Sequence, residues 1–207
     1  MRRERGCTGV AIAIAVVVTL LSSGCARITE TQVAGAAADS SLAPAGPWAD
    51  EFREALGAGV SSYEEKILAD GQITTAEVED VHGRVSGCLA DSGLGIKYNP
   101  DGGFDLLSLD GKYPDDFFDR SDPVLRACEK KYDEYVTMLF EESRRNPEKQ
   151  DEAKITVACL RRVGVVGNDY TERKWRAESD SGVFSFDEYD KRAQQCRLDP
   201  LGLWREP

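Results

Sequence analysis

Four cysteines in the later part of the chain could form disulfide bonds or hold a metal ion. They are Cys88, Cys128, Cys159 and Cys196. Protein zinc sites usually take their ligands from closely spaced pairs such as Cys-x-x-Cys. These cysteines are separated by 40, 31 and 37 positions, and the chain has one histidine, His82. The spacing therefore favours two disulfide bonds over a zinc site, and three connectivities exist for four cysteines.

A run of aspartates between positions 99 and 122 offers the oxygen ligands that calcium binds. The segment holds seven Asp and no Glu, and Asn99, Asp101 and Asp105 follow the alternate-residue spacing of a short calcium loop. The competing interpretation, which we favour, is that these aspartates cap helices and turns on a soluble surface. The sequence indicates no other cofactor. A Ca²⁺ site at Asn99, Asp101 and Asp105 is the metal hypothesis that it leaves open.

Residues 70–77 imitate the end of an EF-hand loop, with Gly71 and Glu77 at the positions that such a loop requires. The same register places Lys66 and Leu68 where calcium needs oxygen ligands. Because a cation and an apolar side chain cannot coordinate Ca²⁺, helix capping explains this segment better.

His82 would have to serve any Ser-His-Asp or Cys-His catalytic site, because it is the only histidine. No Gly-x-Ser-x-Gly motif accompanies it, and phosphate-binding and dinucleotide-binding glycine motifs are absent from the sequence. We therefore interpret His82 as a histidine packed on a helix. A pair of carboxylates could instead hydrolyse glycans, but the sequence does not single out two of its many acids.

The elements that must position these residues are mostly helices. Apolar spacing predicts a kinked helix over 48–69, and Thr74 and Glu77 match a capping box that begins a second helix. Two short runs, 96–98 and 104–106, predict a small β-hairpin. A further amphipathic helix is expected to begin at Ser121-Asp122-Pro123 and to end before Asn146. Shorter helices are expected at 148–163, 170–178 and 186–197. The predicted fold class is mainly α with a small β-hairpin (α+β) and disulfide-linked helices.

Two parts of the chain resemble each other around their cysteines. Cys88-Leu89 and Cys159-Leu160 are each followed by a glycine at the same distance, Gly93 and Gly164. Phe118 and Phe186 each lie ten residues before the next cysteine, and Asp122 and Asp190 each lie six before it. This likeness predicts two similar halves, 47–146 and 147–207. It predicts the pairs Cys88–Cys128 and Cys159–Cys196.

The N-terminus has the pattern of an export signal. Arg2, Arg3 and Arg5 precede an apolar run, Val10–Leu21, which is too short to span a membrane. The end of this run and the residues after it, Leu20-Leu21-Ser22-Ser23-Gly24-Cys25, resemble a bacterial lipobox. We expect residues 1–24 to be a lipoprotein signal peptide and Cys25 to carry the lipid. Ordinary signal cleavage or an uncleaved anchor is the alternative.

The next segment, 25–46, is rich in Ala, Gly, Ser and Thr and reads as a flexible tether. Acyl chains on Cys25 would hold the protein on the outer, extracytoplasmic face of the cell membrane. The chain carries 37 acidic residues against 26 basic ones, with a pI near 4.7. This charge argues against nucleic-acid binding and against adhesion to anionic lipid.

Several short motifs together resemble a family. Residues 70–77, the run Gly87-Cys88-Leu89, and Asp122-Pro123 with Ala127-Cys128 are similar to those of small exported lipoproteins of actinobacteria. That family is largely of unknown function. The resemblance covers about 60–207, and it implies export, a lipid anchor and paired cysteines. It implies no catalytic residue.

From these observations we expect a membrane-anchored extracytoplasmic lipoprotein whose domain binds a protein, peptide or envelope component without catalysis. Its binding surface would combine the aspartate-rich loop with four exposed aromatic residues, Tyr98, Phe104, Tyr113 and Phe117. A cell-envelope hydrolase that uses a carboxylate pair is the alternative. A two-lobed solute receptor is disfavoured, because the mature chain is too short for two lobes and a cleft.

Overall fold

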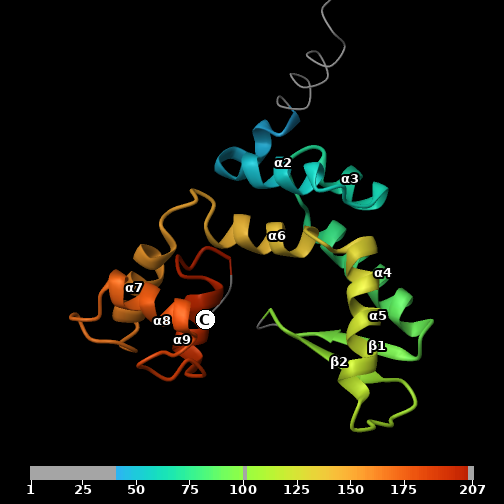
Figure 1. The fold of residues 1–207 in the computed structure, drawn as a ribbon. Helices are drawn as coiled ribbons and strands as arrows, with labels where there is room; N and C mark the ends of the chain where they lie inside the picture. Colours follow the sequence, from blue (N-terminus) through green and yellow to red (C-terminus); the bar gives the residue numbers. More distant parts are fainter. Residues whose placement is uncertain (1–40, 100–101, 205–207) are drawn as a thin grey trace, which may run out of the picture.

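The computed structural model describes residues 41–99 and 102–204. The expected signal peptide, Cys25 and the tether up to residue 40 lie outside the described residues. The described part is mainly α-helical with one two-stranded antiparallel hairpin, as predicted (Figure 1). None of its helices is long and apolar enough to cross a membrane.

In Figure 1, α6 lies between two groups of elements. One group contains α4, α5 and the hairpin, and the other contains α7, α8 and α9. Helices α2 and α3 lie above α6 in this view. The bounds of the elements are η1 Ala43–Trp48, α2 Ala49–Gly57, α3 Ser62–Leu68, α4 Thr75–Ala90, β1 Leu94–Tyr98, β2 Phe104–Ser108, α5 Phe117–Tyr132, α6 Val136–Arg145, α7 Glu152–Arg162, α8 Glu172–Ser181 and α9 Lys191–Leu198.

The N-terminal region differs from its prediction in two ways. The tether was expected to reach residue 46, but Leu42 is buried in the core and η1 begins at Ala43. The kinked helix expected over 48–69 is two helices, α2 and α3. The chain turns between them at Gly59, which has a φ of 83°, and the Ser61 hydroxyl then caps α3 by accepting the Glu64 N–H.

Helix α4 begins with the predicted capping box. The Thr74 hydroxyl accepts the Glu77 N–H, and the Glu77 carboxylate accepts the Thr74 N–H. One side of the helix is fully buried, with Val81, Val85 and Leu89 in the core. Capping and apolar spacing together account for this helix from the sequence alone.

The hairpin pairs Leu94 with Ser108 at one end and Tyr98 with Phe104 at the other. It is longer than predicted at the end that joins α4. One face packs on α4 and α5 through Leu94, Ile96 and Leu106. The hairpin therefore covers the disulfide-linked helices.

The prediction of one helix up to Asn146 is wrong. The chain breaks between α5 and α6 at residues 133–135 although it has no glycine or proline there. A carboxylate oxygen of Glu64, which is 0% exposed, accepts the Tyr135 N–H at 3.0 Å, and the Asp133 carboxylate accepts the Thr137 N–H at 2.8 Å. Both acids thus satisfy backbone donors at the start of α6, so a tertiary contact overrides the local pattern.

Helix α5 also begins before its predicted start. The expected cap at Ser121 and the proline at position 123 lie inside the helix, because the Arg120 N–H already bonds to the Asp116 carbonyl and closes an earlier turn. Pro123 is exposed, so its ring lies on the solvent-facing side of the helix.

Both predicted disulfides are confirmed. Cys88–Cys128 joins α4 to α5, and Cys159–Cys196 joins α7 to α9. Each lies within its own cluster of buried apolar side chains. The division predicted between residues 146 and 147 falls in the loop between α6 and α7.

Candidate functional site

A groove of about 1030 Å³ opens beside the base of the hairpin. It lies between the α4–β1 turn, the loop that follows β2, and the first turns of α5. We call it the aromatic groove, and its apolar lining consists of Leu94, Leu109, Tyr113, Pro114, Phe117 and Val124. Its size is at the upper end of the range of small-molecule binding sites.

Three aromatic rings form a cluster here, and two of them, Tyr113 and Phe117, line the groove. The Phe117 ring is buried, at 7% exposure, and its centroid lies 5.0 Å from that of Tyr113 and 5.2 Å from that of Phe118. Both contacts are edge-to-face, which is a favourable geometry for aromatic pairs. Tyr113 and Phe118 are 56% and 68% exposed. The cluster therefore has a fixed centre and two rings that remain open to solvent.

The predicted binding surface was wrong about Phe117 and did not include Phe118. Phe117 was expected to be exposed but is part of the core. Adjacent residues of a helix point in different directions, so a Phe-Phe pair at a helix start places one ring inside and one outside. That spacing is the signal that would have identified Phe118.

The loop after β2 is held by its own hydrogen bonds. The Ser108 N–H donates to the Tyr113 hydroxyl at 3.3 Å, and the Leu109 N–H donates to the Gly93 carbonyl at 3.0 Å. The Asp110 carboxylate accepts the Ser108 hydroxyl at 2.7 Å and the Lys112 N–H at 3.0 Å, and these bonds hold the pKa of Asp110 below its usual range. Tyr113 is thus placed by the loop before any ligand binds.

Gly95 leaves the space that Leu109 occupies. A Cβ at this position would lie 3.1 Å from Leu109 Cδ2. Leu109 itself is exposed, so it adds an aliphatic side chain to the open wall of the groove.

Two cations stand at the edge of the aromatic groove. Lys112 Nζ lies 3.4 Å from Asp110 Oδ2, and Arg120 Nη1 lies 3.9 Å from Asp116 Oδ1. All four side chains are mostly exposed. Because exposed ion pairs contribute at most about 1 kcal/mol, Lys112 and Arg120 remain available to an anionic group.

The other two predicted binding residues, Tyr98 and Phe104, lie at the opposite end of the hairpin. Tyr98 is half-buried and stacks on His82 with 3.5 Å between ring centroids, and burial raises its pKa above the ordinary value. Phe104 is exposed. The structure therefore separates the four predicted residues into two pairs and places only Tyr113 and Phe117 in the groove.

His82 belongs to a short polar network with Thr137 and Asp133. Its Nε2 lies 3.0 Å from the Thr137 hydroxyl, which donates to Asp133 Oδ2 at 2.8 Å. The single hydroxyl proton is thereby used, so His82 Nε2 acts as the donor to Thr137. In a Ser-His-Asp site the hydroxyl donates to the imidazole instead. Burial lowers the pKa of His82 and raises that of Asp133.

The predicted calcium ligands are only partly visible. The Asn99 side-chain amide donates to Asp105 Oδ2 at 3.2 Å, and Lys97 Nζ lies 4.0 Å from the same oxygen. Asp101 lies outside the described residues. Within the described ranges, no three His, Cys, Asp or Glu side chains gather as metal ligands. The calcium site stays a prediction.

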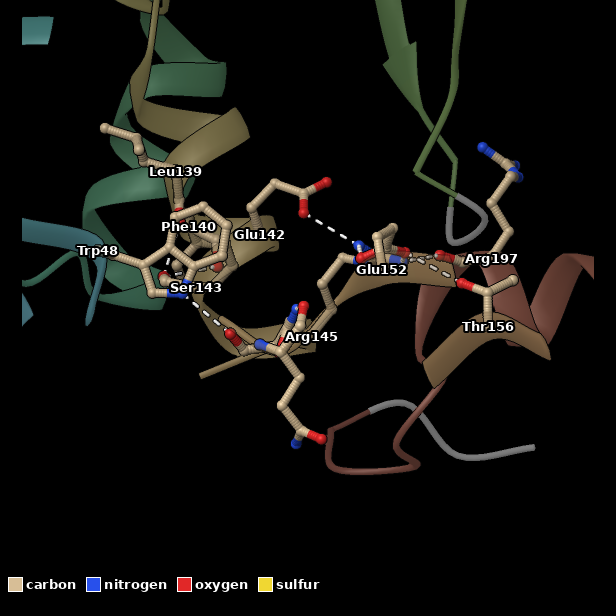
Figure 2. Close-up of polar contacts among 11 residues, drawn as sticks. Trp48, Leu139, Phe140, Glu142, Ser143, Arg145, Glu152, Thr156 and Arg197 are labelled. Atoms are coloured by element: carbon tan, nitrogen blue, oxygen red, sulfur yellow. Dashed lines mark hydrogen bonds and ion pairs between the residues drawn. The ribbon is translucent and has the colours of Figure 1, made fainter. Parts of the chain in front are cut away.

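A second, smaller groove of about 510 Å³ lies where the two halves meet. At its wall Arg145 is 8% exposed and binds both oxygens of Glu152, at 3.0 and 2.6 Å (Figure 2). It also donates to Glu142 at 3.0 Å and to the Arg197 carbonyl at 2.9 Å. One guanidinium thus joins α6 to α7 and α9.

Aromatic contacts reinforce this junction. The Trp48 indole N–H donates to the Asn146 carbonyl at 2.9 Å (Figure 2). The Trp204 ring meets Phe140 edge-to-face, with 6.4 Å between centroids, and Arg144 lies over both rings. Because the donors of Arg145 that are seen here already bind protein oxygens, this groove holds the fold together, and the aromatic groove is the better candidate for a ligand.

Comparisons with protein-family models, with curated protein sequences and with solved structures give no match to this chain.

Proposed function

We propose that this protein is a non-catalytic binding domain, anchored by lipid to the outer face of the cell membrane, and that the aromatic groove is its ligand site. The observation that carries this proposal is the open face of the aromatic cluster. Leu109, Tyr113 and Pro114 expose apolar side chains in the lining that also holds the buried ring of Phe117, and Phe118 adds an exposed ring that packs against Phe117 outside that lining. Contiguous exposed apolar surface in a groove is typical of interaction sites.

The anchor is supported by the sequence and by the disulfides. The lipobox-like residues before Cys25 and the resemblance to exported actinobacterial lipoproteins both favour export with lipid attached to Cys25. Two disulfides in one small domain fit an oxidising compartment, since cytosolic thiols are kept reduced. Mass analysis of the mature N-terminus tests this part directly: an unmodified Cys25, or an N-terminus elsewhere, would contradict the anchor.

Photo-crosslinking in intact cells tests the binding site. A photoreactive phenylalanine analogue at position 109 should capture a defined partner, which mass spectrometry would detect as a discrete mass shift. The capture should disappear when Tyr113→Ser is added. The same analogue at Val183, which is 71% exposed and lies in the other half, is the control. Equal capture at positions 109 and 183 would overturn the site.

A cell-envelope hydrolase is the second candidate. Burial raises the pKa values of Glu129 and Asp133, as a general acid requires. However, both oxygens of Asp133 already accept bonds from Thr137. Glu129→Gln and Asp133→Asn, assayed on cell-wall glycans, distinguish the candidates: hydrolysis by the parent protein that both variants lose would favour the enzyme.

A further inference from the structure

We propose that the aromatic groove binds a free single-chain amphiphile with an anionic head, namely a fatty acid, so this inference rests on the proposed function of the same groove. The apolar chain would lie along the aromatic cluster. The carboxylate would meet the cations at the edge.

The groove suits an apolar chain because its apolar side chains are continuous. Leu109, Tyr113 and Pro114 are open to solvent, while Leu94 and Phe117 in the same lining are buried. An alkyl chain placed here would remove several exposed apolar side chains from water at once, which is the main source of affinity for such ligands. The loop bonds that fix Tyr113 mean that little ordering is needed on binding.

The charges at the groove suit an anionic head. Among the described residues that line it, the cations Lys112 and Arg120 outnumber the single carboxylate, Asp110. This is the reverse of the whole chain, in which acids outnumber bases by 37 to 26. The Asp116 oxygen is 3.9 Å from the Arg120 guanidinium, beyond hydrogen-bond distance. A carboxylate could therefore bind this guanidinium with two parallel hydrogen bonds.

The net charge favours a dissolved fatty acid over an anionic bilayer. The chain carries a formal charge of −11, and a bilayer surface would face all of it. A single carboxylate in the groove would compete with Asp110 and Asp116 for Lys112 and Arg120, whereas a bilayer would also face the acids of the rest of the chain.

Calorimetric titration with two matched probes tests the proposal. The protein is the full exported chain with Cys25→Ser, so that no attached lipid competes for the groove. Dodecanoate and dodecyltrimethylammonium, both below their micellar concentrations, share a tail and differ in the charge of the head. We expect dodecanoate to bind about tenfold more tightly and to lose this preference at high salt. Amide shifts in NMR spectra should gather at 92–94, 108–114 and 117–124.

Variants separate the head from the tail. Lys112→Gln with Arg120→Gln should abolish the preference for dodecanoate, whereas Lys97→Gln, an exposed lysine near Asp105, should leave it unchanged. Leu109→Ser, in the lining of the groove, should weaken both probes about tenfold, and Phe104→Ser, at the far end of the hairpin, should weaken neither.

The outcomes distinguish this proposal from the proposed function. Equal binding of the two probes, a preference that survives Lys112→Gln with Arg120→Gln, or shifts outside the groove would overturn the fatty-acid ligand. If neither probe binds while the crosslinker at position 109 still captures a partner that depends on Tyr113, the ligand class is wrong and the binding site stands. If both experiments fail, both proposals are wrong.

Discussion

The helix pair α4–α5 and the helix pair α7–α9 are built on the same plan. In each, a cysteine near the end of the first helix bonds to a cysteine in the later helix, and the Cα atoms are 5.8 and 5.6 Å apart. In each, a left-handed glycine follows the first cysteine by five residues, Gly93 with a φ of 75° and Gly164 with a φ of 72°. The repeated sequence positions thus correspond to a repeated end of a helix.

The two pairs differ in what the chain inserts between their helices. The first insertion is the hairpin with its self-bonded loop, which builds the aromatic groove. The second is α8, which buries none of its residues. Phe118 and Phe186 occupy equivalent sequence positions, yet Phe118 is exposed beside Phe117 and Phe186 packs against Tyr170. The stapled helices are a shared scaffold, and the insertion carries the candidate function.

Removing the two disulfides separately is expected to have the largest effect. Cys88→Ser with Cys128→Ser, or Cys159→Ser with Cys196→Ser, should each lower the free energy of unfolding by about 4 kcal/mol, because the closed loops are of similar length. Urea unfolding measures the loss. Only the first pair should also weaken ligand binding at the groove. Equal loss of binding in both would show that the halves are not functionally distinct.

Breaking the junction between the halves should come next. Arg145→Leu leaves the partly exposed Glu142 and Glu152 without their buried partner, and we expect a loss of about 2 kcal/mol. Unfolding followed by Trp fluorescence and by far-UV circular dichroism should then give two separate transitions. Arg126→Gln breaks an exposed ion pair with Asp122 and should change stability by less than about 0.5 kcal/mol. Coincident transitions in Arg145→Leu would contradict this role.

Two acids, one in each half, are also expected to respond to pH in opposite directions. Burial raises the pKa of Glu64 in the folded state, so its ionised form destabilises the fold, and stability rises as pH falls from neutral through that raised pKa. In the second half, bonds from Arg192 lower the pKa of Asp190 to about 2, so its contribution is lost as pH falls below the ordinary carboxyl range. Glu64→Gln should reduce the rise seen on mild acidification in thermal melts, to which the raised pKa values of Glu129 and Asp133 also contribute. Glu65→Gln, at the exposed residue next to Glu64, is the control. An unchanged rise in Glu64→Gln would show that the raised pKa of Glu64 is not its cause.

The smallest effect on stability is expected at the open rings. Phe118→Ser should change the free energy of unfolding by less than about 0.5 kcal/mol, because the ring is mostly exposed. Phe117→Ala, one position earlier, should cost about 3 kcal/mol. Chemical denaturation compares the two variants. A large loss in Phe118→Ser would mean that this ring supports the fold and is not held open for a ligand.

Local signals accounted for much of the fold. The capping box at Thr74 and the alternation that gives the hairpin depend on neighbouring residues, and both were predictable. The disulfide pairing was predictable because the two halves repeat their spacing. The break between α5 and α6 was not, because Glu64, which satisfies the Tyr135 N–H, is 71 positions away in sequence.

The candidate site was predicted in part. Tyr113 lies at the groove, and Phe117 lies beneath it instead of at its surface. Tyr98 was expected beside them, but the hairpin register carries it to the other end, where it stacks on His82. The composition of the segment revealed its aromatic character, but only the three-dimensional path of the hairpin decides which rings meet.

The bend between α5 and α6 has a consequence for the order in which this chain acquires its shape. During synthesis the N-terminal part of a domain is made first, so α3 and the carboxylate that stops α5 from running on into α6 are present before either of those helices has been made. A circular permutant that moves residues 41–72 to the C-terminus would supply this template last. Such a chain would pass through an intermediate in which α5 and α6 form one continuous, straight helix.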